Sequence, residues 1–381
     1  MAKIELEGIT KKFGEVVALD NVSLTIEDNE FFVLFGPAGA GKTTLLKTIA
    51  GAEFPEQGLV KIGGEIANHV ESKDRNVAMV FENYALYPNL SVYDNIASPM
   101  RSKLYKKDEE YIKYAIEKVT KMMKIDHLLE RKPSQLSNGQ RQRVALGRCL
   151  VREPNVFLMD EPLAHLDAKL RHFMRGELKE MQTSINSTTI YVTHDYLEAM
   201  SLADRIAILD YGKIVQIGTA QEMYYTPCNE FVARLFGEPE INILKAKKIT
   251  KDNRIAFQIE EQDVLLYPEE DTIQALSEVG TDNIHIGIRG NDISFAFEKP
   301  SNDWLEGSVY ANEPIGNKVI MTVKMGDAKI AITCPNDTSA DMDQEVYVRL
   351  NMKNALFFNG ETQRFITRNN ISHYAENGKK G

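Results

Sequence analysis

The chain has 381 residues, 43% of them hydrophobic and 26% charged, which is typical of a globular protein with two or three domains. Its formal net charge of −10 argues against a nucleic-acid-binding surface. Cys149, Cys228 and Cys334 are widely separated, which argues against a disulfide framework or a cysteine zinc site. Because the sequence contains neither a signal-peptide pattern nor an apolar run of roughly 18 to 20 residues, we expect a cytosolic protein that reaches a membrane only through a partner.

A glycine-rich loop near the N-terminus lies between a predicted strand and a predicted helix. The apolar run FFVLF at residues 31–35 is typical of a buried strand in a parallel sheet, and a helical pattern begins at Lys42 and stops at Gly51. The loop matches the phosphate-loop pattern G-x-x-x-x-G-K-[ST]. The loop and the first helical turn consist of Gly36, Pro37, Ala38, Gly39, Ala40, Gly41, Lys42, Thr43 and Thr44.

This loop has the chemistry of a nucleotide-binding site. Backbone N–H groups of the loop and of the first helical turn point at one place, and the helix dipole favours an anion there. Lys42 would reach the β and γ phosphates, and the Thr43 hydroxyl would bind Mg²⁺. A glycine turn without a ligand is the alternative, but the strand before the loop and the helix after it favour nucleotide binding.

A strand predicted at residues 77–81 precedes a predominantly helical region. Helical patterns run from about residue 88 to residue 150, where Ser91 and Asp94 form an N-terminal box. An apolar stripe with Lys and Glu on its outer side lies within this region. The stripe consists of Ile112, Ala115, Ile116, Val119 and Met122.

The segment QLSNGQRQRVALGRCL, residues 135–150, predicts a second helix whose N-terminus favours an anion. Ser137 is a natural N-cap, and Gln140 three residues later completes a capping box, with Gly139 in the first turn. Because the sequence has one good phosphate loop, we expect this helix end to serve a nucleotide held by a second subunit.

The segment NVFLMDEP, residues 155–162, predicts another buried strand, which ends in two carboxylates. Asp160 would hold Mg²⁺ through a water molecule, and Glu161 would orient or deprotonate an attacking water. A solvent-facing acidic turn after a core strand is the alternative, and the phosphate loop earlier in the chain disfavours it.

The sequence changes character near Leu235. Beyond this residue, short alternating strands are separated by turns rich in Gly, Asn and Asp, which predicts a small β-barrel. This part of the sequence contains no recognisable catalytic constellation, and the single tryptophan, Trp304, is expected to pack rather than to stack on a ligand.

With these motifs in this order, the sequence resembles the ATP-binding cassette family over residues 3 to about 236. The family's LSGGQ signature stands here as LSNGQ at residues 136–140, followed by the acidic strand and the segments LAHLD and YVTHD. The resemblance implies an α/β phosphate-loop ATPase domain over residues 1–236, with a RecA-like core and a helical subdomain at about 88–150. It also implies an all-β, OB-like regulatory domain (TOBE/MOP type) over residues 237–381.

The resemblance implies roles for single residues. Signature residues 137–140 of one subunit would cap the γ-phosphate on the phosphate loop of the other. Phe13, an aromatic residue of the first strand, would stack on adenine. His194 would contact the γ-phosphate and the attacking water, and Asp167 would link the two sites of a dimer.

Taken singly, two of these residues have plainer interpretations. Phe13 alone would be a core residue. His194 alone would be an ordinary surface or capping histidine, because Asp195 is expected to be the N-cap of the next helix, with Glu198 in its first turn.

Two further parts of the sequence, one in the first domain and one in the C-terminal third, are similar to the corresponding parts of carbohydrate importers of this family. The segment YALYPNLSV, residues 84–92, has the form found there, and the pieces IGIRGNDI, EPIGN and FFNGETQ resemble the regulatory domain of importers of the maltose and glycerol-phosphate type. The resemblance implies that the first segment helps to form a groove for the coupling helices of membrane subunits, whereas the alternative makes its residues core residues at a subdomain hinge. The residues concerned are Tyr84, Leu86, Tyr87 and Pro88.

The leading interpretation is the ATP-hydrolysing subunit of a bacterial importer for a sugar or polyol, using ATP and Mg²⁺. Its expected partners are a second ATPase subunit, two membrane permease subunits and, indirectly, a solute-binding protein, with no nucleic acid. We expect it at the cytoplasmic face of the inner membrane. The alternatives are import of an oxyanion, iron or a polyamine, a soluble cassette ATPase outside transport, and a regulator that binds ATP but hydrolyses it poorly.

Two positions depart from the family's usual pattern. Glu82 stands where the family usually has glutamine. A carboxylate can bind the metal ion, but when ionised it cannot donate to water, and it adds negative charge near Glu161. Asn138 replaces the signature's first glycine, a milder change because asparagine tolerates unusual backbone angles. These departures leave open a pairing with a different ATP-binding subunit, although a homodimer is favoured.

The substitution Glu82→Gln is expected to raise the rate of ATP hydrolysis or to shift its Mg²⁺ dependence, because glutamine restores a neutral carbonyl and an N–H donor. Phosphate release measured over a Mg²⁺ titration reports both quantities. A variant with the wild-type rate and the wild-type Mg²⁺ affinity would contradict this prediction.

Overall fold

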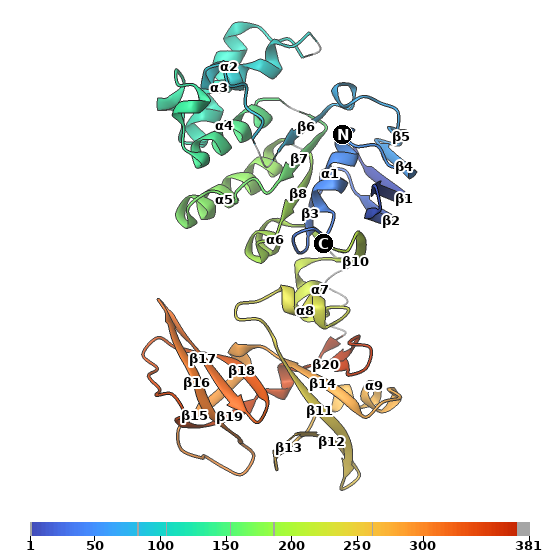
Figure 1. The fold of residues 1–381 in the computed structure, drawn as a ribbon, viewed down its shortest axis with the longest axis vertical. Helices are drawn as coiled ribbons and strands as arrows, with labels where there is room; N and C mark the ends of the chain where they lie inside the picture. The colour runs from blue at the N-terminus through green and yellow to red at the C-terminus, as the bar shows by residue number, and fades with distance from the viewer. Residues whose placement is uncertain are drawn as a thin grey trace. The chain divides into compact units, whose positions relative to one another are not determined.

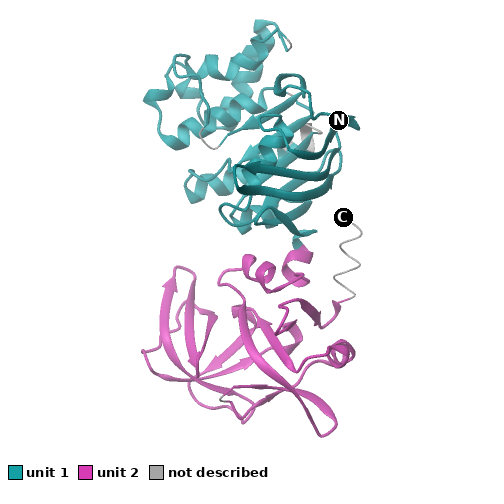
Figure 2. Ribbon diagram, turned by 45° about the vertical axis from the view of Figure 1, so that its right-hand side comes forward, with its two compact units in different colours: residues 1–220 teal, residues 221–381 magenta. Residues whose placement is uncertain are grey.

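The computed structural model describes residues 2–371, apart from residues 82, 83, 104, 153, 186 and 261. The chain divides into two compact units, residues 1–220 and residues 221–381 (Figure 2). The domain boundary near residue 236 that the sequence suggests stays a prediction.

The first unit contains a central, mainly parallel sheet (Figure 1). In sheet order among the described residues, its strands are β10 (Lys213–Gly218), β9 (Arg205–Asp210), β3 (Phe31–Phe35), β8 (Thr188–Thr193), β7 (Val156–Asp160) and β6 (Val77–Val80). β3 coincides with the predicted strand, and all its residues are buried, as expected for a strand covered on both faces. Because β3, β8 and β7 pair in parallel, their carboxyl ends meet at the same edge of the sheet.

An antiparallel sheet and helix α1 (Lys42–Ala50) complete the core of this unit. In sheet order, the described strands are β2 (Val16–Ile26), β1 (Ile4–Phe13), β4 (Gln57–Ile62) and β5 (Glu65–Ile66). Helix α1 begins where the sequence predicts and ends at Gly51, which has a left-handed conformation. Leu45, Leu46 and Ile49 of α1 are completely buried in an apolar cluster that includes both sheets. Burial of each of these side chains contributes about 1.5–3 kcal/mol, which fixes the helix behind the preceding loop.

A group of helices occupies the region predicted to be helical (Figure 1). The Ser91 hydroxyl accepts a hydrogen bond from the Asp94 N–H at 3.1 Å, which confirms the predicted N-terminal box. Of the predicted apolar stripe, Ile112, Ile116 and Val119 are buried and the other two residues are half-buried. The helices are α2 (Val92–Ala97), α3 (Glu109–Met122) and α4 (Asn138–Leu150), and α5 (Ala168–Ile185) and α6 (Tyr196–Leu202) follow in the sequence.

The second unit is rich in antiparallel strands, so the predicted change from an α/β to a β-rich fold is confirmed. One described sheet has the order β13 (Leu265–Leu266), β12 (Arg254–Ile259), β11 (Asn242–Lys251), β14 (Asn283–Ile288), β20 (Leu356–Asn359) and β21 (Phe365–Arg368). The other has the order β15 (Ile293–Ala296), β19 (Glu345–Leu350), β16 (Leu305–Ile315), β17 (Lys318–Met325) and β18 (Ala328–Pro335). Buried side chains of both sheets form one apolar cluster, which makes this unit a domain with its own core.

Short helices accompany the strands of the second unit. They are α7 (Ala220–Tyr225), which begins at the last residue of the first unit, α8 (Glu230–Leu235) and α9 (Ile273–Glu278). Within the described parts of both units, no helix is long and apolar enough to span a membrane.

Candidate functional site

The predicted phosphate loop, residues 36–41, connects β3 to α1 and requires glycine at two positions. A Cβ atom on Gly36 would lie 2.1 Å from the carbonyl oxygen of Leu209, and one on Gly41 would lie 2.5 Å from that of Ala18. Both glycines also have positive φ angles, 154° and 104°. Among the described residues, no side chain caps the first turn of α1, so its N–H groups are available to bind an anion.

Lys42 is a nearly buried cation within this loop, with 6% of its surface exposed. Its Nζ donates hydrogen bonds to the carbonyl oxygens of Gly36 and Pro37, both at 2.9 Å. Burial lowers the pKa of Lys42, and the nearby Glu161 and Asp160 carboxylates partly oppose this shift. The ammonium group is therefore held in the loop, where an incoming anion would meet it.

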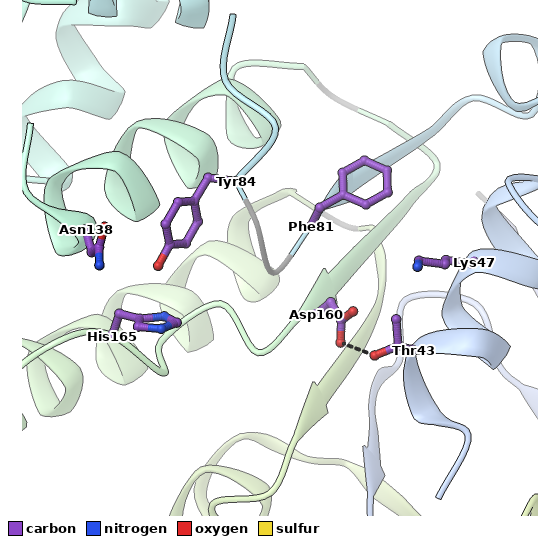
Figure 3. A pocket seen from close by; sticks show the side chains of 7 residues that line it. All are labelled: Thr43, Lys47, Phe81, Tyr84, Asn138, Asp160 and His165. Atoms are coloured by element: carbon purple, nitrogen blue, oxygen red, sulfur yellow. Dashed lines mark hydrogen bonds between the residues drawn. The ribbon is translucent and has the colours of Figure 1, made fainter. Parts of the chain in front are cut away.

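Thr43 and Asp160, predicted from separate motifs, contact each other. The Thr43 hydroxyl donates to Asp160 Oδ1 at 3.1 Å, and Asp160 is 3% exposed at the carboxyl end of β7. Both line a pocket of about 440 Å³, in which they point toward each other (Figure 3). Other residues that line the pocket are Lys47, Phe81, Tyr84, Asn138 and His165. In the described part of the chain, no cluster of three or more His, Cys, Asp or Glu side chains could hold a metal ion unaided.

Glu161 and His194, predicted from different segments, also lie together. His194 Nδ1 is 3.0 Å from Glu161 Oε1. Glu161 has a left-handed backbone, with a φ angle of 47°, and its N–H donates to the Val192 carbonyl oxygen at 3.0 Å. The Gln142 amide of helix α4 donates to the Glu161 carbonyl oxygen at 3.3 Å. The strand ends of β7 and β8 thus place a carboxylate and an imidazole side by side.

A buried acid, Glu198, supports the His194 segment, and the sequence did not reveal this role. Asp195 caps α6 as predicted, accepting the N–H groups of the second and third residues of the helix. Glu198 is only 3% exposed, and its Oε2 accepts hydrogen bonds from the Tyr191 hydroxyl at 2.8 Å and the Thr193 hydroxyl at 2.7 Å. Thr193 Oγ1 in turn accepts the Asp195 N–H at 3.0 Å. Burial raises the pKa of Glu198, against the effect of these two hydrogen bonds.

The signature segment forms the N-terminus of α4 with the predicted capping box. The Ser137 hydroxyl accepts the Gln140 N–H at 3.3 Å, and Gln140 Oε1 accepts the Ser137 N–H at 2.9 Å. A Cβ atom on Gly139 would lie 3.2 Å from the His165 carbonyl oxygen, so this glycine allows close packing against the LAHLD segment. Asn138 lines the same pocket as Thr43 and Asp160 (Figure 3).

The remaining predicted residues of the nucleotide site are Phe13, Asp167 and Glu82. Phe13 is 47% exposed at the end of β1, with Lys11 Nζ 5.1 Å from its ring centroid, so it is not the core residue that its type alone suggests. Asp167 is exposed, and its Oδ1 accepts the Leu170 N–H at 2.9 Å. Glu82 lies outside the described residues.

The segment expected to contact membrane subunits is exposed in part. Tyr87 is 54% exposed and lines a groove of about 340 Å³, and Pro88 is exposed as well, so neither is a core residue. Leu86 is half-buried. Tyr84 instead lines the pocket of Figure 3, with its ring edge-on to that of His165 at a centroid distance of 5.8 Å.

Comparison with known proteins identifies the family. The ABC transporter family model matches residues 19–164. The trehalose/maltose import ATP-binding protein of Thermococcus litoralis is 41% identical, over 96% of this chain and 100% of that protein. The sn-glycerol-3-phosphate import ATP-binding protein of Psychromonas ingrahamii is 38% identical, over 96% of each. A dimeric post-hydrolysis structure of an ATP-binding cassette bound to ADP and Pi is 30% identical and covers 57% of this chain and 98% of that one, with a TM-score of 0.53.

The chain therefore belongs to the ATP-binding proteins of the ABC transporter family. The predicted family resemblance is confirmed. The predicted fold is confirmed as well, since the solved cassette covers 57% of this chain and the second unit is rich in antiparallel strands. The roles of the individual residues stay predictions.

The substitution Glu198→Gln is expected to flatten the pH dependence of stability. Because burial raises the pKa of Glu198 in the folded protein, the native state binds a proton at a pH where the unfolded carboxyl, with a pKa near 4.5, does not. Glu198 should therefore contribute its full stabilisation of the folded protein below the unfolded pKa. This stabilisation should be lost as the pH rises through the native pKa. Its size is about 1.4 kcal/mol for each pH unit that separates the native pKa from the unfolded pKa.

Thermal or denaturant unfolding of both proteins between pH 4 and pH 8, a range that includes the unfolded pKa, measures this effect. The wild type should gain stability relative to the variant toward low pH. A difference between the two proteins that stays constant over this range would contradict the assignment.

Proposed function

We propose that the chain binds ATP with Mg²⁺ on its phosphate loop and hydrolyses it to drive solute import. The observation that carries the proposal is the meeting of two pairs, Thr43 with Asp160 and Glu161 with His194, at one edge of the parallel sheet. One pair offers oxygen ligands and the other offers acid–base groups. Thr43 lies in the first turn of α1, whereas Asp160 ends β7, and Glu161 and His194 come directly after β7 and β8. Membership of the ABC transporter family supports the same activity.

Residues 36–44 would bind the phosphates of ATP. Lys42 Nζ already donates to two loop carbonyl oxygens, and exchanging them for phosphate oxygens gives stronger, charge-assisted hydrogen bonds. The uncapped N–H groups of α1 add donors on the same side. The exposed ring of Phe13 supports its role as a stacking surface for adenine.

The donor set at the Thr43–Asp160 pair fits Mg²⁺. This ion is commonly bound by one or two carboxylates together with substrate phosphates and water, rather than by a complete cage of protein ligands. Thr43 would bind it directly, Asp160 through a water molecule, and Glu82 would add a carboxylate. The ion would neutralise charge on the β and γ phosphates.

Glu161 and His194 would carry the hydrolytic step. Glu161 would orient the attacking water and accept its proton. His194 would contact the γ-phosphate and the same water, and its contact with Glu161 at 3.0 Å keeps the two groups together. The left-handed backbone of Glu161 supports a functional role, because such conformations cost about 1–3 kcal/mol in a residue other than glycine.

A dimer would complete each site. We propose a homodimer in which signature residues 137–140 cap the γ-phosphate on the partner's phosphate loop and Asp167 links the two sites. The capping box supports this arrangement because it shapes the N-terminus of a thirteen-residue helix, where the dipole favours an anion. A solved relative is itself a dimer bound to ADP and Pi.

The solute is proposed to be a sugar or polyol. Two relatives matched over at least 96% of their length are named as importers of trehalose and maltose and of sn-glycerol-3-phosphate. The chain would work at the cytoplasmic face of the membrane with two permease subunits, supplied by a solute-binding protein. Tyr84, Leu86, Tyr87 and Pro88 would contribute to the permease contact, and the groove beside Tyr87 supports this.

The substitution Glu161→Gln is expected to lower ATP hydrolysis at least about 100-fold, because a positioned general base contributes roughly 10²- to 10⁴-fold. ATP binding should persist, so that the Mg²⁺–ATP dimer accumulates. Phosphate release and size-exclusion chromatography with light scattering measure the two effects.

The matched control is Glu180→Gln, since Glu180 is exposed on helix α5. This control should retain wild-type hydrolysis. Wild-type hydrolysis by Glu161→Gln, or a monomer at saturating Mg²⁺–ATP, would refute the proposed function.

A further inference from the structure

Arg148 of helix α4 holds the segment that precedes the groove. Its Nη1 donates to the Ala85 carbonyl oxygen at 2.8 Å, and its Nη2 donates to that of Tyr84 at 3.0 Å. Tyr84 and Ala85 both have left-handed backbones, with φ angles of 64° and 41°. Two consecutive residues of this kind are unfavourable unless their surroundings fix them, and a guanidinium group can hold two neighbouring carbonyls at once.

The same guanidinium group faces the groove. Its Cζ lies 5.5 Å from the centroid of the Tyr87 ring, and both side chains line the groove of about 340 Å³. On the other side, buried Asn95 of α2 accepts the Tyr87 N–H at 2.8 Å and donates to the Tyr87 carbonyl oxygen at 3.1 Å. Hydrogen bonds thus hold residues 84 and 85 to α4 and residue 87 to α2.

Helix α4 connects residues 84–87 to the candidate catalytic site. Its N-terminus is the signature segment capped by Ser137, and Gln142, which is 1% exposed, donates to the Glu161 carbonyl oxygen. Arg148 lies near the other end of the same helix. A helix of this length spans about 20 Å and moves as a rigid body, so a shift at Arg148 must reach the signature unless its hydrogen bonds break.

We propose that Arg148 is a positioning residue that couples the groove beside Tyr87 to the signature end of α4. Anything that displaces residues 84–87 must either carry Arg148 and α4 along or break two hydrogen bonds from a charged donor. This inference rests on the proposed function, because it takes the groove as the permease contact and the signature as the partner's nucleotide contact. It adds a residue that lines the groove and lies at the opposite end of α4 from the signature.

Coupling between two sites is reciprocal, so the proposal can be tested from the nucleotide side. The full-length Glu161→Gln protein is saturated with Mg²⁺–ATP, and amide hydrogen exchange of residues 84–87 is compared with and without nucleotide. We expect exchange in this segment to slow about tenfold on ATP-dependent dimerisation. In Glu161→Gln/Arg148→Lys this change should fall below about twofold, because lysine keeps the charge but cannot bridge both carbonyls in the same fork geometry.

Arg143→Lys in the same background is the matched control. Arg143 also lies on α4. It donates to the backbone carbonyl oxygens of Met123 and Lys124, both at 3.1 Å, and to that of Gly139 in the signature at 3.4 Å, but it does not line the groove. The nucleotide-dependent change at residues 84–87 should persist in this control. Exchange of the amides of β3 and β8 serves as an internal measure of correct folding in all three proteins.

The outcomes separate the inference from the function on which it rests. Absence of an ATP-dependent dimer in all three proteins would refute the proposed function and this inference with it. A dimer that forms without slower exchange at residues 84–87, or a change in exchange that survives Arg148→Lys, would overturn the role of Arg148 alone.

Discussion

Parallel pairing of β3, β8 and β7 is the constraint on which the candidate site depends. Phe35, the last residue of β3, pairs with Thr193, the last residue of β8, and β7 ends beside them. The phosphate loop, Glu161 and His194 each follow directly from one of these strand ends. A register slip of one residue would turn every side chain of a strand to its other face and separate the carboxylate from the imidazole. Since these strands are completely buried, the hydrophobic effect that stabilises the sheet also sets the spacing of the reactive groups.

Helix α4 adds a second constraint, because one rigid element carries several contacts. Its capping box shapes the signature, Gln142 reaches the backbone of Glu161, and Arg148 holds residues 84 and 85. The Gln142 contact is directed at a residue whose left-handed backbone is unfavourable by itself. The geometry of the candidate general base therefore depends on packing between α4 and β7. A movement of α4 would change the position of the Glu161 backbone as well as that of the signature.

The sequence predicts best the features that local chemistry determines. The phosphate loop, the ends of α1 and the caps of α2 and α4 each depend on residues only a few positions apart. It predicts poorly what distant residues determine. Glu198 has the sequence context of an exposed first-turn residue, but Tyr191 and Thr193 of the neighbouring strand bury it and bind it. Arg148 finds its two carbonyl partners more than sixty residues earlier in the chain. Phe13 shows the same limit, since only the structure reveals that this aromatic residue is exposed.

Charge balance explains why nucleotide and metal would bind as one unit. Lys42 is the buried cation of the loop, and Asp160 and Glu161 lie close enough to affect its pKa. A triphosphate would bring further negative charge toward the same carboxylates, and two like charges about 4 Å apart repel by roughly 4 kcal/mol at an effective dielectric constant of 20. A divalent cation between them turns this repulsion into attraction. The donors of the loop and of α1 would cover one side of the γ-phosphate. In the proposed dimer, the N-terminus of α4 in the second subunit would supply positive potential on the opposite side without adding a formal charge.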